Sequence, residues 1–329
     1  HTHTQNKKNN KNRTKKKTPM ATQVNPRDLI PQAQGTYAKI IHQTYKTSSI
    51  PENWQISQDK WIEYHPGFLY ALWTDEDLLW LMTTRFPQYL STFNSFKFPI
   101  MKVDYGRTFV LYEYGGMYAD LDVVPKFDHT YYADFFKSIP QDIGLAETGN
   151  AIGKYRWTNY FMMAKVKSVW WRPYWDFVKN EEYGNKSLWY KLGQYDDYLH
   201  VLLRTGPTAL SNVVLDNVVE SRKHIHTISR LMIGGQQGKN TTTQSDQYNE
   251  AFMYHIEGES WGPPHGIYHA IHHTYCHLPW ILCVILVLML TFFVYKYMMC
   301  NKQSGQKKTK PPTNSEKKKG GLHSGEDTI

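Results

Sequence analysis

Short apolar runs alternate with polar segments in the first part of the chain. Lys39–Thr44 reads Lys-Ile-Ile-His-Gln-Thr, and Phe68–Trp73 reads Phe-Leu-Tyr-Ala-Leu-Trp. Both runs are short and apolar, and turn-forming residues separate them, which predicts two buried strands. Thr74-Asp-Glu-Asp77 matches a capping box and predicts a helix over residues 75–86. This order predicts an α/β fold with a largely parallel sheet, entered through a polar, proline-containing linker over residues 21–36.

The next block carries the most informative pattern. Residues 100–114 repeat apolar positions at helical spacing, and two glycines at 115–116 predict the end of that helix because glycine tolerates a left-handed cap. Residues 117–124 read Met-Tyr-Ala-Asp-Leu-Asp-Val-Val and predict a strand closed by a proline. Alternate side chains of a strand share a face, so Asp120 and Asp122 are expected to point the same way. A second core strand is expected at Asn159-Tyr-Phe-Met-Met-Ala164.

Two carboxylates on one face at the end of a strand repel each other unless something neutralises them. A hard divalent cation with oxygen ligands, Mg²⁺ or Mn²⁺, would do so and would also bind a diphosphate. The crevice beyond the carboxyl ends of an α/β sheet is where such sheets bind ligands. The alternative is a pair of solvated acids, but Asp120 and Asp122 interrupt an apolar run directly after a Gly-Gly helix stop. This context favours a metal site.

Charge and cysteine content exclude several classes of protein. The formal net charge is +9, yet residues 1–20 carry seven Lys or Arg and no acid, and residues 301–329 carry seven Lys and three acids. The two ends therefore account for the whole basic excess and read as disordered basic tails, which argues against nucleic-acid binding by the domain between them. Cysteine occurs only at positions 276, 283 and 300, so that domain has no disulfide framework and no cysteine-based zinc site.

Residues 278–295 read Leu-Pro-Trp-Ile-Leu-Cys-Val-Ile-Leu-Val-Leu-Met-Leu-Thr-Phe-Phe-Val-Tyr, without a charge. This length is about the minimum for a transmembrane helix, which we expect over 278–297; the alternative is a buried core helix. Lysines follow the segment and only histidines precede it closely, so the positive-inside rule places the tail in the cytosol and the preceding domain in the lumen. The expected location is the Golgi or endoplasmic reticulum membrane, crossed once. The chain begins with His1, so a segment could precede it; a start at Met20 would instead give a tail-anchored protein facing the cytosol.

Several ordered blocks resemble glycosyltransferase family 32, the DXD-containing sugar transferases, and in particular its inositol phosphorylceramide mannosyltransferase and initiating α-1,6-mannosyltransferase members. The matching blocks span roughly residues 37–262 and are Lys39-Ile-Ile-His-Gln-Thr-Tyr-Lys46 with Ile50-Pro51, Leu72-Trp-Thr-Asp75, Ile100-Met-Lys-Val-Asp-Tyr-Gly-Arg107 and Leu111-Tyr-Glu-Tyr-Gly-Gly-Met-Tyr-Ala-Asp-Leu-Asp122. The resemblance implies a GT-A, Rossmann-like domain over residues 37–265. It also implies a nucleotide-diphosphate-sugar donor, Mn²⁺ or Mg²⁺, and transfer with retention of configuration.

The resemblance also implies site residues. Asp120 and Asp122 take the catalytic, metal-holding D-x-D role, and His255 would complete the metal shell, with Glu257 or Glu259 of the same loop as substitutes. The donor side would comprise Asp104, Arg107, Tyr118 and Trp261. Thr205-Gly206-Pro207 resembles a turn that borders the acceptor. Alternatives that need no ligand are a surface i,i+3 ion pair between Asp104 and Arg107, an ordinary turn at 205–207 and a loop histidine.

The function implied by the resemblance is transfer of mannose from GDP-mannose to inositol phosphorylceramide. A membrane span soon after the domain favours a lipid acceptor, because it would keep the active site near the bilayer. The alternatives are a hexosyltransferase acting on N-glycans or another glycolipid, and an inactive membrane-tethered binding protein. The expected partners are the donor, a lipid or glycan acceptor, the membrane and a regulatory subunit, and no nucleic acid.

Overall fold

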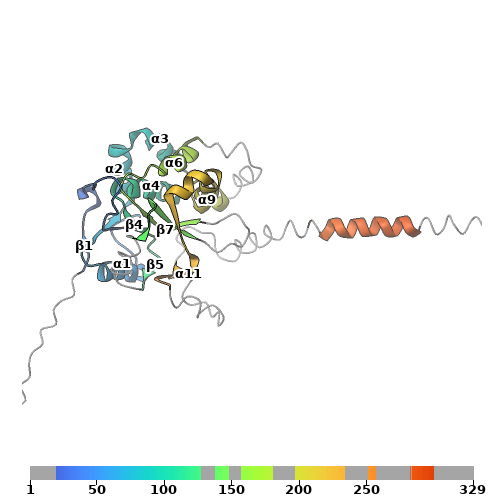
Figure 1. Cartoon of the computed structure of the whole chain (residues 1–329), viewed down its shortest axis with the longest axis horizontal. Helices are drawn as coiled ribbons and strands as arrows, with labels where there is room; N and C mark the ends of the chain where they lie inside the picture. Colours follow the sequence, from blue (N-terminus) through green and yellow to red (C-terminus); the bar gives the residue numbers. More distant parts are fainter. Residues whose placement is uncertain are drawn as a thin grey trace, which may run out of the picture. The chain divides into compact units, whose positions relative to one another are not determined.

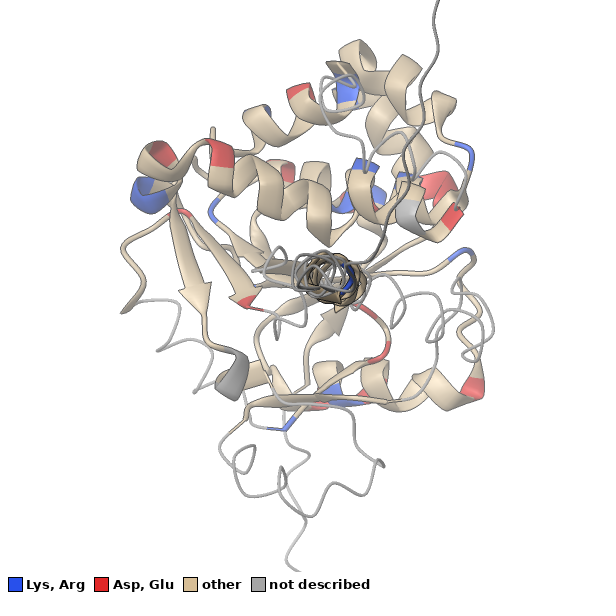
Figure 2. Ribbon diagram, turned by 90° about the vertical axis from the view of Figure 1, so that its right-hand side faces the viewer, with Lys and Arg blue, Asp and Glu red and all other residues tan. Residues whose placement is uncertain are grey.

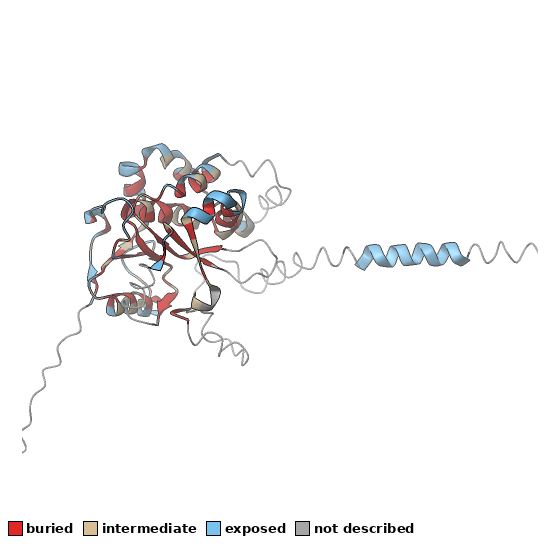
Figure 3. Cartoon of the chain, in the orientation of Figure 1, coloured by how far each residue is buried: buried red, intermediate tan, exposed pale blue. Residues whose placement is uncertain are grey.

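The computed structural model describes residues 20–126, 138–147, 157–180, 197–233, 251–256, 282 and 284–299. The chain separates into two units, residues 1–263 and 264–329. The first unit is a mixed α/β domain around a central sheet (Figure 1). In the second unit, residues 284–299 are helical and their side chains are exposed (Figure 3).

The strands of the first unit form two sheets. They are β1 (Thr22–Gln23), β2 (Ile40–Thr44), β3 (Leu69–Trp73), β4 (Gly116–Ala119), β5 (Val123–Pro125), β6 (Ile143–Glu147), β7 (Trp157–Ala164), β8 (Ile225–Ile228) and β9 (Met253–His255). Within the described residues, the main sheet has the order β1-β3-β2-β4-β7-β6-β8, and β5 pairs with β9 in a separate antiparallel ribbon. The pairings β1–β3, β3–β2, β2–β4 and β6–β8 are parallel, whereas β7 runs antiparallel to both β4 and β6.

The helices cover both faces of the main sheet. They are the 3₁₀ turn η1 (Pro26–Asp28) and the helices α1 (Glu52–Tyr64), α2 (Asp75–Arg85), α3 (Pro87–Ser95), α4 (Pro99–Tyr114), α6 (Trp171–Asn180), α8 (Asp197–Arg204), α9 (Pro207–Asp216), α10 (Val218–His224) and α11 (Arg230–Ile233). In Figure 1, α2, α3, α4, α6 and α9 lie on one side of the sheet, and α1, α11 and β5 lie on the other. Successive residues of a strand pack on opposite faces of the sheet. The Ile40 side chain belongs to the hydrophobic core on one face and the Ile41 side chain to the core on the other.

The elements with strong local signals form where the sequence predicts them. Thr74 and Asp77 exchange both capping-box hydrogen bonds at the start of α2. Helix α4 ends at Gly115, which has φ of 65° and donates its N–H to the Leu111 carbonyl. Gly116, at φ 89°, starts the next strand.

The structure contradicts two of the predictions. The strand predicted over 117–124 is broken: β4 ends at Ala119 and β5 begins at Val123, because the two halves pair with different partners, β7 and β9. The prediction of a largely parallel sheet is confirmed for the described strands, because only the two pairings of β7 are antiparallel. The predicted linker over 21–36 includes β1, which pairs with β3, and the buried side chains of Ala21 and Leu29.

The membrane anchor stays a prediction. Among the residues that the structure describes, no helix is both long enough and apolar enough to cross a bilayer. The predicted segment 278–297 lies partly outside those residues. The ribbon in Figure 2 marks Lys and Arg in blue and Asp and Glu in red, and residues of both charges occur along the described helices of the domain.

Gly116 should be among the least replaceable glycines of the domain. A Cβ at this position would collide with the main-chain carbonyl oxygen of Ile40 in β2, and its positive φ disfavours any other residue. We expect Gly116→Ala to lower the free energy of unfolding by roughly 2–4 kcal/mol, measured by denaturant or thermal unfolding. Gly67→Ala is the matched control: Gly67 has φ of 79°, but no atom lies within 4 Å of the place that its Cβ would take, so about 1–2 kcal/mol should be lost. Equal losses in the two variants would contradict the steric argument.

Candidate active site

The two aspartates of the D-x-D motif occupy a tight turn between β4 and β5. The Val123 N–H donates to the Asp120 carbonyl over 3.0 Å and closes the turn. The Asp120 N–H donates to the Tyr160 carbonyl of β7 over 2.8 Å, and the Ile256 N–H donates to the Asp122 carbonyl over 2.8 Å. Two segments distant in the sequence, β7 and the end of β9, therefore hold the turn. The motif lies at the carboxyl end of β4, as predicted, but on a turn rather than on a strand face.

Asp120 is tied to the domain by its side chain. Its Oδ1 lies 3.2 Å from a guanidinium nitrogen of Arg107 and accepts a 2.7 Å hydrogen bond from the Tyr118 hydroxyl, which lies 2.8 Å from the Thr44 hydroxyl. The carboxylate still has 31% of its side-chain surface exposed. Burial raises the pKa of Asp120, the nearby Asp122 adds to this, and Arg107 opposes it. A bound cation would remove that penalty on the charged form.

Asp122 is held far less tightly. Its Oδ1 is buried and has no hydrogen-bond partner among the described residues, while 30% of the side chain is exposed. Its Oδ2 lies 3.8 Å from Nδ1 of His255, which the β5–β9 ribbon places opposite Val123. The His255 ring packs edge-on against Tyr160, with 4.3 Å between ring centroids. An unpartnered carboxylate oxygen beside a second carboxylate indicates a cation-binding position.

These residues fit a divalent cation that has few protein ligands. Within the described residues, no group of three or more His, Cys, Asp or Glu side chains is arranged to hold a metal ion. Mg²⁺ and related hard cations commonly use one or two carboxylates together with water and substrate phosphates. Asp120 and Asp122 match that pattern, and the unpartnered oxygen of Asp122 is the feature that a cation would satisfy. A metal-ligand role for His255 stays a prediction.

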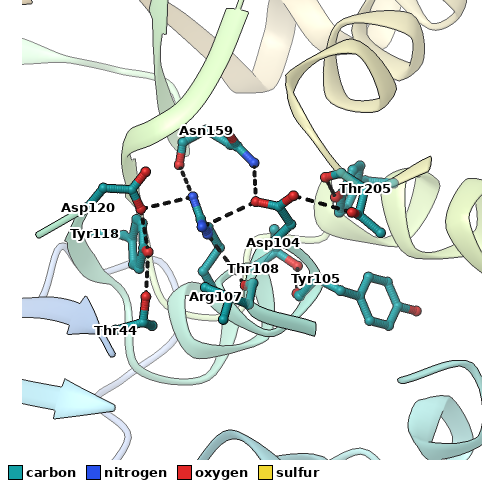
Figure 4. Close-up of polar contacts among 11 residues, drawn as sticks. Thr44, Asp104, Tyr105, Arg107, Thr108, Tyr118, Asp120, Asn159 and Thr205 are labelled. Carbon is teal, nitrogen blue, oxygen red and sulfur yellow. Dashed lines mark hydrogen bonds and ion pairs between the residues drawn. The ribbon is translucent and has the colours of Figure 1, made fainter. Parts of the chain in front are cut away.

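Arg107 lies between two carboxylates, as Figure 4 shows. Besides Asp120, it contacts Asp104 one helical turn earlier in α4, at 3.2 Å, and both side chains of that pair are almost completely buried. The guanidinium donates to the Asn159 carbonyl over 2.8 Å and lies 4.6 Å from the centroid of the Tyr118 ring. The ion pair is therefore not the exposed i,i+3 pair considered as an alternative from the sequence. Arg107 is a buried counter-ion for Asp120 of the D-x-D motif.

Asp104 continues this network away from the turn. Its Oδ1 accepts from the Asn159 side-chain amide over 2.8 Å, and its Oδ2 accepts from the Thr205 hydroxyl over 3.3 Å. Burial raises the pKa of Asp104 to about 7, while Arg107, Thr205 and Asn159 oppose the shift. Because protein donors occupy both oxygens, Asp104 supports Arg107 in this structure. A direct contact of Asp104 with the donor stays a prediction.

The Thr205-Gly206-Pro207 turn joins the same network. The Tyr174 hydroxyl donates to the Thr205 carbonyl over 2.5 Å, and Pro207 is the first residue of α9. A Cβ on Gly206 would lie 2.9 Å from the Cα of Leu202, so the turn is closely packed against α8. The structure connects this turn to the D-x-D motif through Asp104 and Arg107 (Figure 4). Its acceptor-side role stays a prediction.

Two members of this site carry little signal in the sequence. Asn159 is expected there only as part of a core strand, and Tyr174 is not singled out. A polar residue at the start of an apolar strand is a weak signal, and Tyr174 is one tyrosine among 24. The candidate residues Glu257, Glu259 and Trp261 lie outside the described residues.

The sequence of this segment matches a known protein family. Residues 51–136 match the model of the family described as glycosyltransferase sugar-binding region containing DXD motif. That range includes α4 and the D-x-D turn, so the resemblance seen in the sequence is confirmed.

Curated relatives match over limited lengths. The chain is 48% identical over 84 residues to mannosyl phosphorylinositol ceramide synthase SUR1 of Saccharomyces cerevisiae, covering 26% of this chain and 22% of the relative. It is 47% identical over 85 residues to inositol phosphoceramide mannosyltransferase 3 of Schizosaccharomyces pombe, covering 26% and 24% of the two chains. A longer match, to inositol phosphoceramide mannosyltransferase 2 of the same yeast, is 33% identical over 175 residues and covers 53% and 45%. The matched segments thus span less than half of each of these relatives.

Among solved structures, the apo form of mouse xyloside xylosyltransferase 1 aligns with 69% of this chain and 99% of its own length. The identity is 12% and the TM-score is 0.39, so this likeness carries no argument about function.

Proposed function

We propose that this chain, whose residues 51–136 carry a glycosyltransferase sugar-binding region with a DXD motif, transfers mannose from a nucleotide-diphosphate donor to inositol phosphoceramide. One observation carries the proposal. The unpartnered Asp122 oxygen lies in the same turn as Asp120, at the carboxyl end of a sheet strand and within the family segment. The names of the matched yeast proteins support mannose as the sugar and inositol phosphoceramide as the acceptor.

The residues of this site divide the work between binding and support. Asp120 and Asp122 would hold Mn²⁺ or Mg²⁺, which neutralises the diphosphate and stabilises it as a leaving group. Arg107 keeps Asp120 charged and correctly oriented, because it is buried against that carboxylate. The Tyr118 hydroxyl donates a hydrogen bond to Oδ1 of Asp120 and also contacts the Thr44 hydroxyl, so both residues help to orient the Asp120 carboxylate.

The finer parts of the proposal concern the ligands and the fold. We assign GDP-mannose as the donor, a GT-A architecture to the domain, and retention of configuration to the transfer. The donor side comprises Asp104, Arg107, Tyr118 and Trp261, and the turn at Thr205–Pro207 faces the acceptor. A regulatory subunit is a further expected partner.

The proposal includes attachment to a membrane. The uncharged segment over residues 278–295 would anchor the chain in the Golgi or endoplasmic reticulum membrane, with the domain in the lumen. Such an anchor suits an acceptor whose reactive hydroxyl lies at the bilayer surface.

A transfer assay tests the proposal on the full chain in detergent micelles. Radiolabelled GDP-mannose and inositol phosphoceramide should yield a mannosylated lipid, EDTA should abolish the product, and Mn²⁺ should restore it. Parallel reactions with GDP-glucose, UDP-glucose and UDP-galactose test the donor, and free oligomannose and glucosylceramide test the acceptor. Transfer to either of those two acceptors alone would replace the acceptor assignment. Absence of both transfer and Mn²⁺-stimulated donor hydrolysis with every nucleotide sugar would favour an inactive binding protein.

A further inference from the structure

A second polar network lies beneath the D-x-D turn, on the opposite side from Arg107. The side chains of Gln43 in β2, Ser57 in α1 and Tyr70 in β3 meet in the interior, and Gln43 and Ser57 have no exposed surface. None of them touches the carboxylates. They contact the main chain of the turn instead.

The hydrogen bonds of this network run in one direction. The Tyr70 hydroxyl donates to Oε1 of Gln43 over 2.7 Å, and Nε2 of Gln43 donates to the Ser57 hydroxyl over 3.1 Å. The Ser57 hydroxyl then donates to the Val123 carbonyl over 2.6 Å. At the outer end, the Gln58 side-chain amide donates to the Tyr70 hydroxyl over 3.2 Å. The hydroxyl groups of Tyr70 and Ser57 each accept one hydrogen bond and donate another. This arrangement fixes the orientation of the Gln43 amide.

Both ends of the turn are held by this network. Nε2 of Gln43 also donates to the Asp120 carbonyl over 3.2 Å, at the first residue of the turn. The Val123 carbonyl, just after the turn, accepts hydrogen bonds from the Ser57 hydroxyl and, over 2.9 Å, from the indole N–H of Trp61. The main chain on either side of Asp122 is therefore clamped from α1 and β2.

We infer that Gln43, Ser57 and Tyr70 are positioning residues that set the affinity of the D-x-D turn for a divalent cation. Asp122 itself has a buried oxygen without a partner, so its own side chain does little to fix the turn. Its geometry therefore depends on the main-chain contacts of the turn: those from Gln43 and Ser57 at Asp120 and Val123, and the one from the Ile256 N–H at Asp122. Groups that orient metal ligands without binding the metal change affinity or activity by roughly 10- to 100-fold when they are removed. The inference rests on the proposed metal-dependent function.

The test is Ser57→Ala in the full chain, with Mn²⁺ binding measured directly. Free Mn²⁺ is followed by electron paramagnetic resonance, first without nucleotide and then with GDP. We expect the Mn²⁺ dissociation constant to rise roughly 10- to 100-fold. At saturating Mn²⁺ the turnover number should return to near the wild-type value, because both carboxylates remain. Tyr70→Phe, which removes a more distant link, should shift the constant in the same direction by a smaller factor.

The matched control is Ser211→Ala. Ser211 is also fully buried, and its hydroxyl bonds to the main chain of Trp157 over 3.1 Å, away from the turn. Its loss should lower thermal stability to a similar extent and leave Mn²⁺ binding unchanged. Equal Mn²⁺ affinity in Ser57→Ala and the wild type would overturn the inference and leave the proposed function standing. A wild-type chain that binds no Mn²⁺, with or without GDP, would remove the metal-dependent function and the inference together.

Discussion

Asp122→Asn should lower transfer activity roughly a hundredfold to a thousandfold while leaving the thermal stability of the chain unchanged or slightly higher. The activity falls because the substitution removes one of two carboxylate charges that hold the cation and its diphosphate. The stability does not fall because Asp122 has a buried oxygen without a partner and lies next to a second carboxylate. Removing its charge relieves repulsion between like groups. Initial rates with saturating Mn²⁺ and thermal unfolding curves on the same preparation measure both effects.

Asp120→Asn should differ in one respect. Activity should fall to the same level, but the melting temperature should fall as well, because Asp120 is the partner of both Arg107 and Tyr118. Asp59→Asn is the control: Asp59 is an exposed acid on α1 that accepts from the Gln55 amide, and its loss should change neither quantity. A wild-type turnover number for Asp122→Asn at saturating Mn²⁺ would contradict the assignment of Asp122 as a metal ligand.

The parts of this site that the sequence could predict are those with local causes. The cap at Thr74, the end of α4 at Gly115 and the buried run at Ile40–Thr44 each follow from neighbouring residues, and the structure confirms all three. The position of Asp120 and Asp122 at the carboxyl end of a strand follows from the same local pattern. The paired carboxylates themselves predicted a divalent cation, and the resemblance to a known family added the nucleotide-sugar donor.

The parts that could not be predicted depend on distant pairings. Residues 117–124 alternate as one strand would, but Val123 pairs with His255 while Ala119 pairs with Phe161, and this division breaks the strand at the motif. The hydrogen bond from Ser57 to the Val123 carbonyl also depends on a distant pairing, since the two residues are 66 positions apart in the sequence. Spacing along the chain carries no signal for such a contact.

Arg107→Met should destabilise the domain by about 3–5 kcal/mol, which is the cost expected when one partner of a buried ion pair is removed. The long apolar side chain keeps much of the volume, so the loss reports the charge rather than a cavity. The buried carboxylate of Asp104 and the partly exposed carboxylate of Asp120 would lose their shared counter-ion. Lys97→Met is the control, because Lys97 forms an exposed ion pair with Asp197 and should cost no more than about 1 kcal/mol. Denaturant unfolding of both variants measures the difference.

A double variant separates the ion pair from other effects of the substitution. Asp104→Asn combined with Arg107→Met leaves only the carboxylate of Asp120 without its counter-ion, instead of two carboxylates. It should therefore be less destabilised than the sum of the two single variants, with a coupling of roughly 0.5–3 kcal/mol. Strict additivity would show that Arg107 and Asp104 contribute to stability independently, so that Arg107 acts through Asp120 or by packing over Tyr118.

The cost of Arg107→Met should also depend on pH in a defined direction. A carboxyl group whose pKa in the folded chain lies above its unfolded value favours folding at low pH, and that contribution is lost as the pH rises through the folded pKa. Burial already raises the pKa of Asp104 to about 7, and Arg107 opposes the shift. Without Arg107 the pKa of Asp104 rises further, so the wild type and the variant should lose stability in parallel up to about pH 7, and only the variant should continue to lose it above that pH. A difference in unfolding free energy that stays constant above pH 7 would mean that Arg107 does not lower the pKa of Asp104.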